Sequence, residues 1–150
     1  MRRFLTFGVL VFFLSGCATM GRLQTPSGRP EVSIEGTTIK DATNACVSSL
    51  SANGWQIEQA ADYMVQAVHT SDNMTVDFMW GSSYDFHQTW YRMIFTFVKE
   101  SNGVRIYGVQ QVVANRGTGF EKVLQLTSQK AYESTQSYLE QIRNTILRNR

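Results

Sequence analysis

The stretch that decides the fold is residues 89–114, TWYRMIFTFVKESNGVRIYGVQQVVA. In its first half, alternate residues fall on the two faces of an extended strand. One face carries Tyr91, Met93, Phe95 and Phe97, and the other carries Trp90, Arg92, Ile94, Thr96 and Val98. Ser101-Asn102-Gly103 is typical of a tight turn, and residues 104–114 continue as a second strand. The sequence therefore predicts a long antiparallel hairpin with one aromatic-rich face.

Upstream of this hairpin, the sequence predicts a strand, a helix and three further strands. Residues 31–35 alternate as a short strand, and Thr38 with Asp41 resembles a capping box at the start of a helix over 38–53. Apolar residues recur along that helix at three-to-four spacing, at Ile39, Ala42, Cys46 and Leu50. From Trp55 the period changes to two, which predicts a hairpin ending at Thr70 and a further strand over 74–80.

The C-terminal part of the chain is expected to be helical. Thr118 and Glu121 have capping-box spacing, which predicts a helix that begins there and continues to the terminus. Its apolar stripe comprises Leu124, Ser128, Ala131, Thr135, Tyr138, Ile142 and Ile146. Because Ser and Thr interrupt this stripe, a break at Thr127 and Ser128 is an alternative.

These elements predict one α+β domain over residues 31–150. It would be a two-layer domain, in which an N-terminal-side helix and a long C-terminal helix pack on an antiparallel sheet of four to five strands. The element order is similar to that of the helix-grip modules in the lipoprotein C subunit of the outer-membrane β-barrel assembly machine. The outward face of the long strand is less polar than a solvated face, so either helices cover both sides of the sheet or a partner does.

The N-terminus has the features of an export signal. Arg2 and Arg3 precede an apolar run over residues 4–14. At about 1.5 Å per helical residue this run spans roughly 16 Å, about half of a ~30 Å hydrocarbon core. Leu14-Ser15-Gly16-Cys17 then resembles the lipobox of bacterial lipoproteins. A plain signal peptide with a coincidental cysteine is the alternative.

The lipobox resemblance implies that residues 1–16 are removed as a signal peptide and that Cys17 is lipidated. Residues 17–30 contain both prolines and several small polar residues, and we expect them to form a flexible tether. By the sorting rules of the same family, Ala18 favours the outer membrane. We therefore expect a lipid-anchored protein of the outer membrane, with its domain facing the periplasm.

The composition argues against several classes of function. Without Arg2 and Arg3 the chain carries twelve basic and twelve acidic residues, so no basic surface predicts nucleic-acid binding. His69 and His87 have no metal-ligand spacing, and Cys46 has no second free thiol to pair with once Cys17 is lipidated. We expect Cys46 to be buried, and we expect no catalytic residue, no metal and no cofactor.

The segment 80–90 is the candidate binding site, because bulky ring-bearing side chains in a loop offer a large contact area. The candidate residues are Trp80, Tyr84, Phe86, His87 and Trp90. The alternative is that these side chains fold into the core. The sequence thus predicts a binding or structural module of a cell-envelope assembly, with an envelope protein as its partner. The alternatives are an envelope enzyme or enzyme inhibitor that acts through residues 80–90, or a prophage- or plasmid-borne surface exclusion lipoprotein. The sequence does not predict the oligomeric state.

Overall fold

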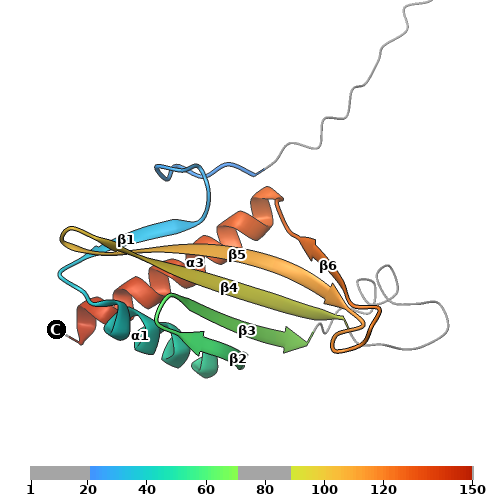
Figure 1. The fold of residues 1–150 in the computed structure, drawn as a ribbon. Helices are drawn as coiled ribbons and strands as arrows, with labels where there is room; N and C mark the ends of the chain where they lie inside the picture. Colours follow the sequence, from blue (N-terminus) through green and yellow to red (C-terminus); the bar gives the residue numbers. More distant parts are fainter. Residues whose placement is uncertain (1–20, 71–88, 150) are drawn as a thin grey trace, which may run out of the picture.

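The computed structural model describes residues 21–70 and 89–149, which form an antiparallel sheet and two helices (Figure 1). The elements in chain order are β1 (Glu31–Glu35), α1 (Ile39–Ala52), β2 (Gln56–Ala61), β3 (Met64–Thr70), β4 (Trp90–Glu100), β5 (Gly103–Ala114), β6 (Lys122–Gln125) and α3 (Gln129–Arg148). The predicted α+β class, with a helix on the N-terminal side and a long C-terminal helix, is confirmed. The predicted strand over 74–80 lies outside the described residues.

The sheet is built around the predicted long hairpin. Its strand order is β1-β5-β4-β3-β2, and β6 also pairs with β5. β4 and β5 run antiparallel in unbroken register from the pair Trp90 and Val113 to the pair Glu100 and Gly103. β1 pairs with the first half of β5, and β6 pairs with its last residues. The alternation in residues 89–114 therefore gives both the central strands and their register.

The first helix begins where the capping signal predicts. The Thr38 hydroxyl accepts a hydrogen bond from the Asp41 backbone N–H at 3.1 Å and donates one to the Asp41 carboxylate at 2.7 Å. Asn53 ends the helix. The predicted apolar stripe turns inward: Ala42, Cys46 and Leu50 are buried, and Ile39 is partly buried against the core. The predicted burial of Cys46 is confirmed.

The second helix, α3, begins at a later residue than the one primarily predicted. Thr118 caps only a turn, in which its hydroxyl accepts a hydrogen bond from the Phe120 N–H at 3.2 Å. The next residues form β6 instead, and α3 begins after Ser128, whose hydroxyl accepts from the Ala131 N–H at 3.3 Å. The start at Thr118 is therefore wrong, and the alternative break at residues 127 and 128 is correct. The reason is nonlocal: β5 extends beyond β1, and β6 pairs its backbone groups there.

The core lies between the sheet and the two helices. In Figure 1 both helices lie on one face of the sheet. The buried face of β4 presents Met93, Phe95 and Phe97, as predicted, and α3 contributes Leu139 and Ile142. Contact between α3 and β5 is close at Gly108, where a Cβ atom would lie 2.5 Å from the Thr135 Cγ2 methyl. The helices in residues 21–70 and 89–149 thus cover one side of the sheet.

The segment before β1 is attached to the domain. The Gly21 N–H donates to the Thr127 carbonyl at 2.7 Å, and the Ser27 N–H donates to the Glu31 carboxylate at 2.6 Å. The Gly108 N–H donates to the Pro30 carbonyl at 3.0 Å. Residues 21–30, which we expected to belong to a flexible tether, are therefore bound to the body, and residues 17–20 of that tether lie outside the described residues. Among the described residues, neither helix combines the length and the apolar character needed to cross a membrane.

Candidate functional site

Of the residues predicted for binding, the structure describes Trp90. Trp80, Tyr84, Phe86 and His87 lie outside the described residues, as does Cys17, so their roles stay predictions. Trp90 begins β4 on the face of the sheet opposite α1 and α3, and its side chain is half-buried. It is cross-strand neighbour to Val113 on β5 and to Thr70 on β3. Trp90 is therefore a surface residue of the sheet and does not belong to the core between sheet and helices.

Charged side chains gather around Trp90. The Arg116 guanidinium lies over the Trp90 ring, with its carbon 4.4 Å from the ring centroid. Arg116 Nε also donates to Glu58 Oε1 at 2.7 Å. Arg92 contacts two carboxylates, with Nε 3.5 Å from Glu58 Oε2 and Nη2 3.3 Å from Glu121 Oε1. We call Glu58, Trp90, Arg92, Arg116 and Glu121 the Trp90 cluster.

Glu58 on β2 is the acidic centre of this cluster. It lies where the register between β2 and β3 shifts, and its carboxylate accepts a hydrogen bond from Gln66 Nε2 at 2.8 Å and contacts both arginines. Burial of the carboxylate opposes its ionisation. Hydrogen bonds from Gln66 and Arg116, together with the positive charges of Arg116 and Arg92, outweigh that effect, and the pKa of Glu58 is lowered from its ordinary value. Glu58 is therefore a carboxylate at neutral pH.

The central side chains of the cluster are largely buried, and its residues line a depression that is open to solvent. The side chains of Arg92 and Glu58 are 13% and 17% exposed, which is low for charged groups on a sheet surface. Glu58, Trp90, Arg92, Arg116, Gly117 and Glu121 line a shallow depression of about 350 Å³. Guanidinium groups, carboxylates and an aromatic ring here can bind a partner by hydrogen bonds and stacking.

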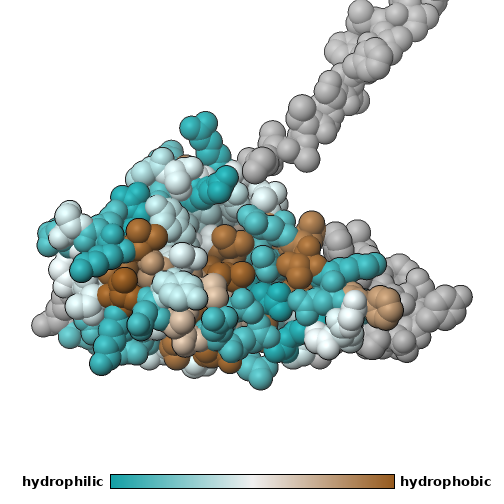
Figure 2. All heavy atoms as spheres, in the orientation of Figure 1, coloured by the Kyte–Doolittle hydropathy of each residue, from teal (hydrophilic) through white to brown (hydrophobic). Residues whose placement is uncertain are grey.

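Apolar side chains continue across the same face. Ile94 and Val109 are cross-strand neighbours and half-buried, and Val98 is 44% exposed. A second ionic group lies at the other end of these apolar side chains, where Arg105 contacts Glu100 at 2.6 Å and Glu31 at 3.6 Å. Figure 2 shows this side of the sheet, with hydrophobic residues between hydrophilic ones. This surface, from the Trp90 cluster to Arg105, carries neither α1 nor α3, and we call it the helix-free face.

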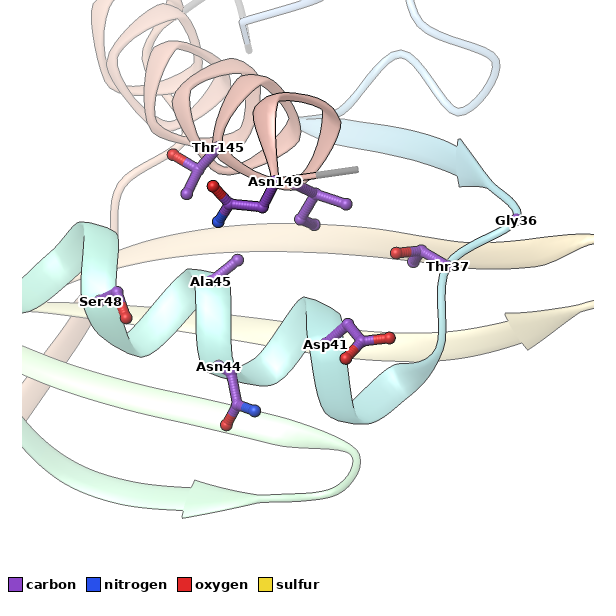
Figure 3. Close-up of a pocket in the computed structure, with 9 residues that line it drawn as sticks. Gly36, Thr37, Asp41, Asn44, Ala45, Ser48, Thr145 and Asn149 are labelled. Carbon is purple, nitrogen blue, oxygen red and sulfur yellow. The ribbon is translucent and has the colours of Figure 1, made fainter.

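A larger groove lies at the other side of the molecule and has weaker chemistry. It holds about 510 Å³ between α1 and the C-terminal turns of α3 (Figure 3). Its lining is mostly short polar side chains, including Asn44, Ser48 and Thr145. The one carboxylate among its lining residues, Asp41, is hydrogen-bonded within the helix cap. The lining residues that the structure describes bring no histidine, cysteine or lysine into this groove.

The remaining titratable candidates have structural environments. Cys46 is fully buried, and burial raises the pKa of its thiol far above the ordinary value, so the reactive thiolate is suppressed. His69 Nδ1 lies 2.7 Å from the Thr70 carbonyl oxygen, and its ring lies 5.6 Å from that of Trp55. In residues 21–70 and 89–149, no group of three His, Cys, Asp or Glu side chains is placed to hold a metal ion.

Comparison with protein-family models gives no match, and comparison with curated proteins gives no relative. The site therefore has to be interpreted from its own geometry. Sequence reasoning placed Trp90 and Arg92 on the outward face, but it did not find Glu58 or Arg116, which are separated by 58 positions. It assigned Glu121 to a helix cap, whereas the carboxylate accepts a hydrogen bond from the Gly117 N–H at 3.0 Å and pairs with Arg92.

Proposed function

We propose that this protein is a lipid-anchored lipoprotein of the outer membrane, whose periplasmic domain binds an envelope protein through the helix-free face. The observation that carries the binding role is this face itself. Both helices of the described residues pack on the opposite side, and the strands present Trp90, Ile94, Val98 and Val109 between two ionic groups. Aromatic residues and arginine around an apolar centre are the composition of protein interfaces.

The size of the helix-free face fits a protein partner. At about 3.3 Å per residue along each strand and about 4.8 Å between strands, the lengths of β1 to β6 give a planar area of roughly 700 Å². A specific protein complex buries about 800 Å² on each partner. The face is also nearly neutral, because Arg92, Arg116 and Arg105 are paired with carboxylates. A protein with a mixed apolar and polar surface matches this pattern better than a polyanion does.

Anchoring is supported by the lipobox at residues 14–17, and the chain from Gly21 onward is hydrogen-bonded to the domain. Acylation of Cys17 would hold the domain at the membrane, where two or three acyl chains resist dissociation. A binding domain so confined meets envelope proteins at high local concentration. Anchor and binding face together describe a structural module of an envelope assembly.

Site-specific photocrosslinking in cells tests the binding role. A photoreactive residue at Thr96, which is exposed on the helix-free face, should capture a discrete envelope protein, and one at Gln141 on the outer side of α3 should not. Val98→Asp should abolish that capture, whereas Leu147→Asp should preserve it, because the two side chains are similarly exposed at 44% and 47%. Equal capture at both positions, or capture that Val98→Asp leaves unchanged, would contradict the proposal.

A further inference from the structure

A second exposed surface lies at the edge of the sheet formed by β6 and the turn before it. Phe120 is 82% exposed, Val123 is 48% exposed and Leu124 is 40% exposed. These are three of the six large hydrophobic side chains that are exposed in residues 21–70 and 89–149. Because successive strand residues point to opposite faces, Val123 and Leu124 make both sides of this edge apolar. All four residues of β6 are exposed.

The chain enters the domain beside this edge. The Gly21 N–H donates to the Thr127 carbonyl at 2.7 Å, and the Arg22 N–H donates to the Gln129 side chain at 2.9 Å. The contact at Gly21 is so close that a Cβ atom there would lie 2.8 Å from the Gln129 Cα. The entry point is therefore fixed at the junction between β6 and α3.

Chain length places any anchor at Cys17 close to the same edge. Gly21 is the fourth residue after Cys17, and a fully extended chain covers at most about 14 Å over that interval. Leu124 lies three residues from Thr127, within about 10 Å, and Phe120 lies seven residues away, within about 25 Å. A bilayer surface that holds residue 17 is thus within reach of Phe120, Val123 and Leu124.

We propose that Phe120, Val123 and Leu124 rest on the bilayer surface to which Cys17 is anchored, so that the domain has one fixed orientation. This inference depends on the lipid anchor of the proposed function. The cations around the edge suit lipid phosphates, since Arg22, Lys122 and Lys130 are all exposed. The carboxylates nearby are engaged, Glu121 with Arg92 and Gly117 and Glu133 with Gln129. Long basic side chains with an apolar patch are typical of surfaces that lie in the membrane interface.

Fluorescence in vesicles tests the orientation. The full chain, purified in its acylated form, is reconstituted in vesicles of phosphatidylethanolamine and phosphatidylglycerol after an environment-sensitive dye is attached to Phe120→Cys. Leu147→Cys is the matched control, because this exposed residue lies at the opposite end of α3. Cys46 is buried with a suppressed thiolate, so labelling is selective for the introduced cysteine.

The emission maximum of the dye at position 120 should shift to shorter wavelength, and spin-labelled lipids should quench its fluorescence. The dye at position 147 should show neither effect. Similar quenching at both positions, or none at position 120, would overturn the inference. A signal at position 120 that grows with protein density would assign this edge to a second copy of the chain and would also overturn it. The mass of the purified chain separates the two proposals: unacylated Cys17 refutes the anchor, whereas acylated Cys17 without quenching at position 120 refutes the orientation alone.

Discussion

Replacement of Gly108 by alanine tests how α3 seats on the sheet. The added Cβ atom would lie 2.5 Å from Thr135 Cγ2, 3.2 Å from Phe95 Cε1 and 3.4 Å from Leu139 Cδ1. Carbon atoms prefer separations of about 3.5–4.0 Å, so the first contact overlaps by roughly 1 Å. Overpacking of this kind costs about 1–3 kcal/mol, and alanine regains about 0.5 kcal/mol through the unfolded chain. We expect Gly108→Ala to lower the free energy of unfolding by about 1–2 kcal/mol.

Thr135→Ser provides a matched rescue. It removes the Cγ2 methyl and retains the hydroxyl, which donates to the Ala131 carbonyl at 2.9 Å. Alone it should cost about 0.8 kcal/mol for one buried methyl group. In combination, the two changes should cost less than the sum of the single changes by about 1 kcal/mol, because the main overlap is gone.

Urea unfolding of the four chains, each beginning at residue 18, measures this coupling. Circular dichroism follows the transition, and each kcal/mol corresponds to about 2–8 °C in Tm for a domain of this size. If Gly108→Ala leaves the free energy of unfolding unchanged, α3 does not pack on β5 as described. The same conclusion follows if the double variant loses as much unfolding free energy as the two single variants together.

Three further predictions concern the cluster, the helix start and the buried thiol. Folding lowers the pKa of Glu58, so its ionised form stabilises the domain. This contribution is fully present at a pH above the ordinary glutamate pKa of about 4.3, and it is lost as the pH falls through the pKa of the folded state. Glu58→Gln should therefore flatten the dependence of unfolding free energy on pH below about 4.5, and an unchanged pH profile would contradict the ion pairs. Ser128→Ala should cost about 1 kcal/mol in urea unfolding by removing the α3 cap, whereas an equal or larger loss from Thr118→Ala would favour the earlier helix start. Cys46 should react with a maleimide only in urea, and labelling of the folded chain at the rate of an exposed thiol would refute its burial.

The fold could be predicted from sequence wherever one periodic signal acted alone. Alternation over residues 89–114 gave the central hairpin and its buried face, and Thr38 with Asp41 marked the start of α1. At the C-terminus two local signals competed. The spacing of Thr118 and Glu121 favoured a helix, but pairing of Val123 with Val113 on β5 decided the structure. Such pairing depends on how far β5 extends beyond β1, which no local pattern specifies.

The candidate site was harder to predict, because it depends on the register between distant strands. Alternation correctly put Trp90 and Arg92 on the outward face. Glu58 joins them from β2, two strands away from β4, and Arg116 reaches the Trp90 ring from the connection after β5. Residues this distant in the chain become neighbours through the sheet order, and the sequence carries no local signal for their contact.

Mass spectrometry of the native protein tests the central claim most directly, which is that acylated Cys17 anchors this domain to a membrane. The account predicts that the mature chain begins at residue 17 and that its first residue carries diacylglycerol on sulfur. It also predicts that Cys17→Ala prevents this processing and removes the mature form from the membrane fraction. A mature chain with an unmodified residue 17, or one that retains residues 1–16, would contradict the claim.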